Sequence, residues 1–236
     1  GRANEVATQD DMTRMAALVE EALAAGAVGF STSRTIGHRT MSGVPIPGTY
    51  AADDEVLQLA EAMRRAGKGV FELIPGGTVG DVAQLGGEHT SLEEEIALMD
   101  KVSHVSERPV TFTMVQNRDH PEGWRDVLAA VEKCNTRGAQ LYPQVASRPI
   151  GLVTNIQTYH MFQARQTYLK LATLPFAERL DQLRKPDVRA AILSERDVRS
   201  GKSGMMANAN VIFRQALPHL YELALPIDYE PTPDQC

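Results

Sequence analysis

The chain repeats one unit four times, a helix with an apolar stripe followed by a short apolar strand, and this repetition limits its fold more than any other feature. In the helical part of each unit, apolar residues recur every three or four positions, which predicts an amphipathic helix. The strand part is a short apolar run, which is typical of a strand buried on both faces. The four strands are expected over Ala27–Ser31, Gly69–Ile74, Pro109–Val115 and Ala139–Val145.

Local signals mark the ends of these helices. Thr8 followed by Asp11, and Thr90 followed by Glu93, have the spacing of a capping box, in which side chains bond the first free N–H groups of a helix. Gly67 is expected to stop the second helix, since glycine is favoured just past a helix end.

Helices that alternate with short apolar strands predict parallel pairing through right-handed crossovers, and therefore an α/β sheet or barrel. Spacing alone does not separate an open doubly wound sheet from a closed barrel. No GxGxxG or GxxxxGK[ST] follows a predicted strand, which argues against nucleotide-binding layouts. A complete eight-stranded barrel takes about 250 residues, whereas the four units occupy roughly the first 150 residues. The expected barrel is therefore partial.

Beyond the fourth strand the pattern becomes helical. Helices are expected over Ile156–Ala172, Phe176–Arg184, Pro186–Arg196 and Asn210–Leu223. We therefore expect a partial barrel over residues 1–151 and a helical segment of the same catalytic domain over residues 152–236. This segment packs over the catalytic mouth or covers the outside of the barrel.

Charge and cysteine content exclude several kinds of partner. The net charge of −6 and the pI near 5.6 leave no basic stripe for nucleic acid. Cys134 and Cys236 lie far apart without a CxxC pair, which argues against disulfides or a thiolate metal site and favours the cytoplasm. No apolar run reaches the about 20 residues that span a bilayer. A small-molecule substrate is the expected partner, and a homo-oligomer is compatible with this composition.

The loop after the first strand, FSTSRTIGHRTMSGVPIPGTYA, concentrates polar groups at the end of a strand where parallel barrels carry their active sites. It contains Ser33, Arg34 and His38. His38 is the preferred catalytic residue because an imidazole can bind metal or transfer protons. The alternative is a solvated loop whose hydroxyls bond their own backbone. His89, His104, His160 and His219 are expected to be structural. His120 follows the third predicted strand and is positioned for chemistry, although the adjacent Pro121 also indicates a helix-start turn.

Two segments give a more specific indication. The run EEALAAGAVGFSTSRTIGHRTMSGVPIPGTYAADDEVLQLAEAM, Glu20–Met63, and the run GAQLYPQVASRPIG, Gly138–Gly151, resemble N-acyl-D-amino-acid deacylases of the amidohydrolase superfamily. The resemblance implies a (β/α)8 TIM-type barrel of which this chain holds about strands four to seven, so the chain is expected to be an internal fragment. It also implies a divalent metal, usually zinc, which lowers the pKa of bound water and polarises an amide carbonyl. The HxH pair and the acidic proton acceptor of that family would lie outside the chain.

The chain departs from the family pattern where strands five and six end. Those ends read GVFELIP and VTFTMVQ, without the usual histidines. Glu72 and Gln116 offer oxygen ligands in their place. The alternatives are that Glu72 is a buried carboxylate paired to a cation and that Gln116 is an amide bonded to backbone.

The fourth predicted strand ends in residues that the resemblance assigns to substrate binding. Arg148 is the natural anchor, because a guanidinium holds a carboxylate through two parallel hydrogen bonds. The alternative is a surface arginine paired to a helix carboxylate. The full substrate-binding set is expected to be Ser33, Arg34, Tyr142, Gln144, Ser147 and Arg148.

The leading functional prediction is metal-dependent hydrolysis of a non-peptide amide bond in a small N-acyl-D-amino acid or related compound. A cyclic-amide hydrolase and a degenerate barrel that binds an acidic small molecule without turnover are the alternatives. Expressed alone, four barrel units expose sheet edges, so we expect instability or aggregation, and a monomer that melts cooperatively would contradict this.

Overall fold

The computed structural model describes residues 5–35, 38, 45–76, 91–116, 120–147, 155–157, 160–198, 220, 221 and 226. The chain divides into two compact units, Gly1–Ile150 and Gly151–Cys236, and each is described by itself. No described helix is long and apolar enough to cross a membrane.

The first unit is an α/β structure with a four-stranded parallel sheet, which confirms the α/β class and the parallel pairing that the sequence predicts. The described strands do not show whether the sheet closes into a barrel. Its strands are β1 (Gly29–Ser33), β2 (Val70–Ile74), β3 (Val110–Thr113) and β4 (Leu141–Gln144). They lie in the sheet in the order of the chain, β1-β2-β3-β4. A doubly wound sheet reverses its strand order at a switch point. The described sheet has no such reversal, so its edge strands are the first and the last in the chain, β1 and β4.

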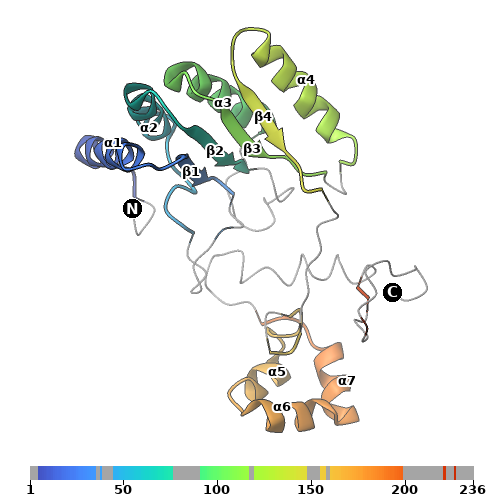
Figure 1. The fold of residues 1–236 in the computed structure, drawn as a ribbon. Coiled ribbons are helices and arrows are strands. Elements are labelled where there is room, and N and C mark those ends of the chain that lie inside the picture. The colour runs from blue at the N-terminus through green and yellow to red at the C-terminus, as the bar shows by residue number, and fades with distance from the viewer. Residues whose placement is uncertain are drawn as a thin grey trace. The chain divides into compact units, whose positions relative to one another are not determined.

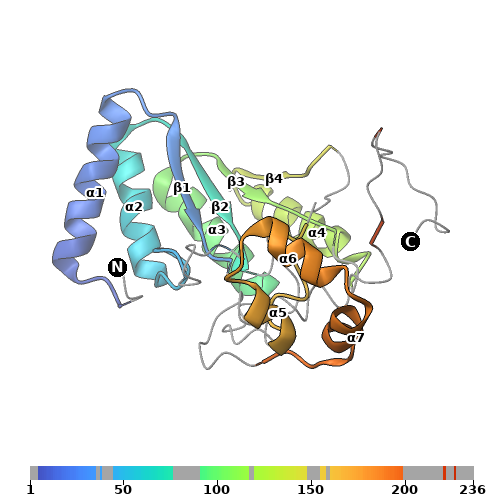
Figure 2. The ribbon, with the colours of Figure 1, turned by 90° about the horizontal axis from the view of Figure 1, so that it is seen from below.

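The helices of the first unit follow the same order along one side of the sheet (Figures 1 and 2). They are α1 (Gln9–Ala24), α2 (Asp53–Ala66), α3 (Leu92–Ser106) and α4 (Gly123–Asn135). Right-handed crossovers in a sheet with sequential order put every helix on the same face. Among the described residues of this unit, no helix therefore covers the opposite face of the sheet.

Capping explains where these helices start and stop. The capping box of Thr8 and Asp11 is present as predicted, and Gly67 ends α2 at a φ of 68°. The second predicted box is wrong by one residue. Ser91 has the extended backbone of an N-cap, and its hydroxyl accepts a hydrogen bond from the Glu94 N–H at 3.2 Å.

The hydrophobic core lies between the helices and the sheet face that they cover. From the strands it takes the buried side chains Phe71, Leu73, Val110, Phe112 and Leu141. From the helices it takes Leu23, Val56, Met63, Met99, Val102 and Val131 among others. The agreement with the predicted stripes is partial: the stripe of Val56, Leu59, Ala60 and Met63 is buried in α2, whereas α1 buries Ala16 and Leu23 instead of its predicted stripe.

The prediction that the strands are buried on both faces is wrong. Successive side chains of a strand point to opposite faces, and only one face of this sheet is covered by the unit's helices. The strand register aligns Ser31, Glu72, Thr111 and Tyr142 in one row across all four strands. We call these four residues the polar row. Ser31 is exposed, and Tyr142 is 49% exposed.

The first strand also begins later than predicted. It starts at Gly29 rather than Ala27, and the Val28 side chain is 90% exposed. A Cβ on Gly29 would lie 2.0 Å from the Val70 carbonyl oxygen, so β1 and β2 approach more closely here than any larger residue permits. Ala27 and Val28, which the apolar run assigned to the strand, therefore belong to the connection between α1 and β1.

The second unit contains α5 (Gln166–Leu171), α6 (Phe176–Leu183) and α7 (Pro186–Ser194). The predicted helix Ile156–Ala172 is wrong over its first part, because the described residues before 166 form turns and a bridge. Arg165 pairs with Asp197 as an isolated antiparallel bridge, and an ion pair of 3.2 Å joins their side chains. The predicted helix Asn210–Leu223 lies almost wholly outside the described residues.

The second unit contains a buried histidine, His160. His160 packs edge-on against the Tyr168 ring, with centroids 4.5 Å apart. Burial, followed by the charge of Arg179, lowers the pKa of His160 below its ordinary value. The unfolded chain therefore binds the proton more tightly. The contribution of neutral His160 to stability is complete above the ordinary histidine pKa of about 6.5 and is lost as the pH falls toward the folded-state pKa.

We accordingly expect the segment 160–198 to lose protection from amide hydrogen exchange between pH 7.5 and pH 5. His160→Phe retains an aromatic ring beside Tyr168 and removes the titrating group, so it should flatten this dependence. An equally steep loss of protection in the variant would contradict the assignment to His160.

Candidate functional site

The candidate site lies where the strands of the first unit end. Parallel strands bring their carboxyl ends to one edge of the sheet, which is where α/β proteins place their sites. At this edge β1 ends in Ser33, β2 in Ile74, β3 in Thr113 and β4 in Gln144. The catalytic and substrate-binding residues predicted for the site come from β1, the loop after it, β4 and the residues that follow β4, and the predicted metal ligands Glu72 and Gln116 come from β2 and from the residues after β3.

Ser33 and His38 form the most defined contact of the site. The Ser33 hydroxyl and Nδ1 of His38 are 2.9 Å apart, and Ser33 is buried whereas His38 is exposed. The backbone also holds the histidine, because its N–H donates to the Thr35 carbonyl at 3.2 Å and its carbonyl accepts from the Ile46 N–H at 3.4 Å. With Nδ1 engaged by Ser33, the ring presents Nε2 for proton transfer.

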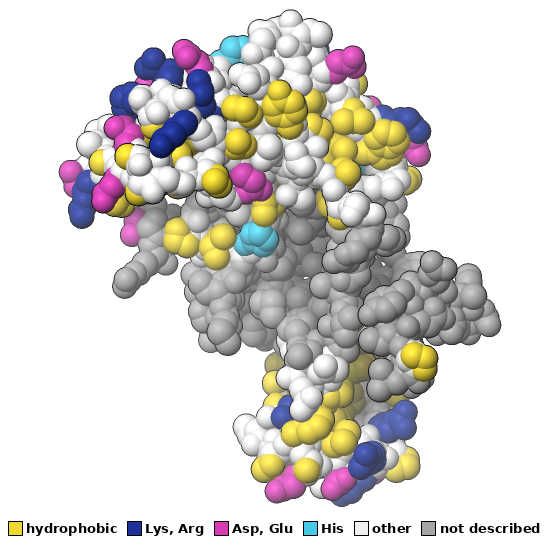
Figure 3. Space-filling view, in the orientation of Figure 1, with side chains coloured by type: hydrophobic (Ala, Val, Ile, Leu, Met, Phe, Trp, Pro, Cys, Tyr) yellow, Lys and Arg dark blue, Asp and Glu magenta, His cyan; other side chains and the backbone are white. Residues whose placement is uncertain are grey.

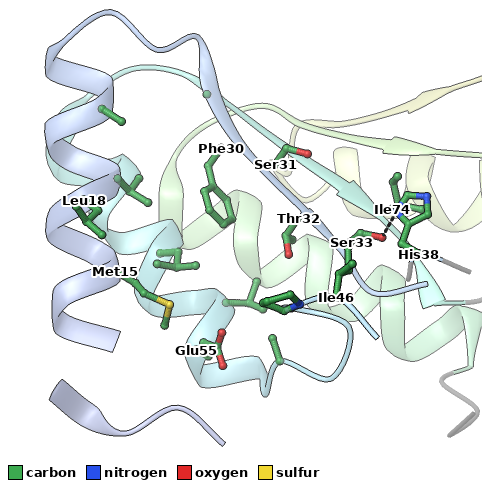
Figure 4. A pocket seen from close by; sticks show the side chains of 18 residues that line it. Met15, Leu18, Phe30, Ser31, Thr32, Ser33, His38, Ile46, Glu55 and Ile74 are labelled. Atoms are coloured by element: carbon green, nitrogen blue, oxygen red, sulfur yellow. Dashed lines mark hydrogen bonds between the residues drawn. The ribbon is translucent and has the colours of Figure 1, made fainter. Parts of the chain in front are cut away.

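A pocket of about 650 Å³ adjoins this pair, between α1, β1 and α2. Its far wall is apolar and includes Met15, Leu18 and Phe30, while Ser33 and His38 stand together at its other end (Figure 4). The Phe30 ring meets that of Phe71 at 60° with centroids 5.3 Å apart. The pocket therefore follows the outer edge of β1 rather than the middle of the sheet.

Arg34 has protein partners. Its Nε donates to Oε1 of Glu95 at 2.9 Å, and its Nη1 donates to the Ala51 carbonyl at 2.7 Å. Glu95 lies in the first turn of α3, is 1% exposed, and has one oxygen, Oε2, without a hydrogen bond. The pair ties the end of β1 to α3 and fixes the start of the loop that carries His38.

Glu72 and Gln116 both have partners other than a metal. The Ser31 hydroxyl donates to the Glu72 carboxylate across the polar row. Gln116 Nε2 donates to the Pro121 carbonyl at 2.8 Å, which is the backbone-bonded arrangement given above as its alternative. No group of three His, Cys, Asp or Glu that could hold a metal ion occurs among the described residues. Those residues do not fit a metal, and we derive no step through one.

The predicted substrate-binding residues of β4 lie at the other edge of the sheet from His38. Tyr142, Gln144 and Ser147 are exposed. Arg148 lies outside the described residues. The structure thus brings Ser33 and His38 together, and it holds the β4 group apart from them by the width of the sheet.

His104 has protein partners on both ring nitrogens. Its ring spans α3 and the end of α4, with Nδ1 at 2.8 Å from the Asp100 carbonyl and Nε2 at 3.4 Å from the Arg137 carbonyl. These carbonyls accept from the ring and raise the pKa of His104. The contact lies at the amino ends of the strands, away from His38.

Sequence reasoning missed two contributors to the site. Glu95 follows a cap in an acidic first turn, which indicates a solvated position rather than a partner for Arg34. Thr111 was counted as part of an apolar run, although strict alternation along β3 puts it on the polar row. The alternation of apolar and polar side chains along β3 was the sequence signal that could have placed Thr111 on the polar row.

Comparisons with known proteins give a partial likeness. No family model matches the chain, and no curated protein is significantly similar. The chain is similar to a D-aminoacylase mutant in complex with CuCl2, with a TM-score of 0.44 and 21% identity over 61% of this chain and 26% of that one. The same values relate it to a D-aminoacylase whose crystal structure is described as defining a novel subset of amidohydrolases. The matched part spans about a quarter of those chains, and a likeness of this extent assigns no activity.

Proposed function

We propose that this chain is part of an amidohydrolase that cleaves the amide bond of a small N-acyl-D-amino acid or related compound. The hydrogen bond between Ser33 and Nδ1 of His38 at the carboxyl end of β1 carries the proposal. It sets a proton-transferring group at the edge where parallel α/β proteins do chemistry. The sequence resemblance over Glu20–Met63 and Gly138–Gly151 supplies the reaction class.

In the proposed reaction, Nε2 of His38 takes a proton from water as the water oxygen bonds to the amide carbonyl carbon. The C–N bond then breaks, and the same nitrogen returns the proton to the leaving amine. This step requires the tautomer in which Nδ1–H donates to the Ser33 hydroxyl oxygen, and that hydrogen bond keeps the ring oriented. A positioned general base of this kind contributes about 10²- to 10⁴-fold in rate.

Charge on the polar face supports one substrate orientation. Glu72 lies in the polar row beside Ser31 and would repel a substrate carboxylate. The carboxylate is better held away from Glu72, and the resemblance assigns it to Arg148, which follows β4 in sequence.

The activity test compares wild-type protein with His38→Ala on a panel of N-acyl-D-amino acids. We expect kcat/KM to fall about 10²- to 10⁴-fold in the variant. His104→Gln is the matched control, because this histidine lies at the opposite end of the strands, and its activity should stay within about twofold of wild type, as changes far from the site usually do. Retained activity in His38→Ala would contradict the proposed role.

Metal content should be measured in the same samples, because the resemblance implies zinc. Turnover with stoichiometric metal would mean that ligands lie beyond the described residues. A folded, metal-free protein without turnover would contradict the hydrolase proposal. It would favour the degenerate barrel that binds an acidic small molecule, an alternative supported by the lack of a three-ligand group among the described residues.

A further inference from the structure

One member of the polar row, Glu72, carries a carboxylate. It lies on β2 between Ser31 of β1 and Thr111 of β3, each in register with it. Its strand neighbours Phe71 and Leu73 belong to the core beneath the helices, so the half-buried Glu72 side chain points to the other face of the sheet. Neighbouring strands are about 5 Å apart, which brings both hydroxyl side chains within reach of a group bound at the carboxylate.

The hydrogen bonding of Glu72 leaves most of its acceptor capacity free. The Ser31 hydroxyl donates to Oε2 of Glu72, and this bond uses one of about four acceptor sites of a carboxylate. Ser31 brings no positive charge. Among the described residues, no ion pair includes Glu72. The carboxylate therefore has room for a cationic donor.

The surroundings of β2 add negative rather than positive charge. The sequence between β2 and α3, residues 75–90, contains Asp81 and Glu88 and neither Lys nor Arg. In Figure 3, the described Lys and Arg side chains of the first unit gather toward its two sides, over the helices, rather than over the strands between them. A concentration of one sign of charge attracts ligands of the opposite sign, so this part of the sheet favours a cation.

The proposed base lies one step along the sheet from this carboxylate. Ser33 follows Ser31 by two residues on β1, so both side chains point to the same face. Nδ1 of His38 is in turn bonded to the Ser33 hydroxyl. Two strand residues span about 7 Å, which is the length of side chain that joins an amide at His38 to a cation at Glu72. The flexible four-carbon stem of lysine, which ends in an ammonium, matches this length.

We infer that Glu72 is a specificity-determining residue that binds a side-chain ammonium of the substrate. The preferred substrates are then N-acyl derivatives of D-lysine and of D-diamino acids of similar length. This inference rests on the proposed function, because it places the scissile amide at His38. The ammonium donates to the Glu72 carboxylate and to the hydroxyl oxygens of Ser31 and Thr111, which flank it in the polar row.

The chemistry of the polar row favours an ammonium over other side-chain ends. An ammonium has three donors and no acceptor, and the row offers one carboxylate and hydroxyl oxygens on both sides of it. A guanidinium pairs best with both oxygens of a carboxylate, whereas Oε2 of Glu72 is already bonded to Ser31. An apolar side chain would remove water from the carboxylate without replacing its hydrogen bonds. An acidic side chain would meet a like charge.

The first test compares kcat/KM for N-acetyl-D-lysine with kcat/KM for N-acetyl-D-norleucine, which has a similar stem without the ammonium. We expect wild-type protein to prefer the lysine compound. Glu72→Gln keeps the size of the side chain and an oxygen that accepts from Ser31, but removes the charge. It should lower the preference about 10- to 100-fold, the size of a hydrogen bond to a charged group. Equal values of kcat/KM for the two compounds in wild-type protein would overturn the inference.

Glu61→Gln is the matched control for loss of one carboxylate. Glu61 lies on α2, on the helix side of the sheet, and its side chain is 42% exposed and pairs with Arg64 at 3.1 Å. The preference for the lysine compound should stay within about twofold of wild type, as surface changes away from a site usually allow. An equal loss of preference in Glu61→Gln would mean that the net charge of the protein selects the cation, and it would overturn a contact at Glu72.

The second test measures binding by calorimetry in His38→Ala and therefore does not require turnover. N-acetyl-D-lysine should bind about 10- to 100-fold more tightly than N-acetyl-D-norleucine, and adding Glu72→Gln should remove this difference. That result together with an inactive wild-type protein would contradict the hydrolase proposal and support the contact at Glu72. Equal affinity for the two compounds, or no binding of either, would overturn the inference whether or not the wild-type protein hydrolyses them.

Discussion

Gly29→Ala is expected to destabilise the first unit by at least about 3 kcal/mol, the upper part of the usual cost of overpacking. A Cβ at this position would lie 2.0 Å from the Val70 carbonyl oxygen and 2.9 Å from the carbon and nitrogen of that residue. These are backbone atoms of the paired strand, so no side-chain rotation relieves the clash. Relief requires β1 to separate from β2 at its first residue pair.

Urea unfolding, followed by circular dichroism, measures this effect. Gly123→Ala is the control, because a Cβ there meets only the Cβ of His120 at an ordinary 3.5 Å. Alanine is favoured over glycine in a helix by about 0.5–1 kcal/mol, so the control should be as stable as wild type or slightly more so. A wild-type midpoint in Gly29→Ala would mean that β1 and β2 do not pair in this register.

The helix–strand order could be read from sequence because it depends on local periodicity. The stripe of Val56, Leu59 and Met63 is buried in α2, and the Thr8 cap forms as its spacing predicts. The burial of each strand could not be read in this way. Whether Thr111 is covered depends on which face of the sheet the helices occupy, and that is decided by strand order rather than by the residues of β3.

The candidate site likewise contains one contact that the sequence predicts and one that it does not. Ser33 and His38 are five residues apart, so their contact follows from one loop whose composition singled it out. Arg34 and Glu95 are 61 residues apart and meet because the end of β1 lies beside the start of α3. No sequence pattern around Arg34 or around Glu95 predicts their contact. Sequence therefore marks the loop as functional, while the partner that holds it is visible only in the fold.

Removal of Arg34 gives the second large effect that we expect. In Arg34→Met, Glu95 keeps its buried position, 1% exposed, without its guanidinium partner. Leaving one charge of a buried pair uncompensated costs about 3–5 kcal/mol. The matched control is Arg65→Met, because Arg65 and Glu20 form a pair of 2.6 Å at the surface, 44% and 39% exposed. Its loss should cost less than about 1 kcal/mol in the same urea unfolding experiment.

The double variant Arg34→Met/Glu95→Leu separates a structural role from substrate binding. Replacing both charges with apolar groups of similar size is often neutral or stabilising, so most of the lost stability should return. If Arg34 acts only by tying β1 to α3, the double variant also recovers the turnover of the Ser33–His38 pair with an unchanged KM. If Arg34 binds substrate, stability returns while KM stays raised. Failure of the double variant to regain stability would mean that the ion pair contributes more than its own charge compensation, through the Ala51 carbonyl that Arg34 also holds.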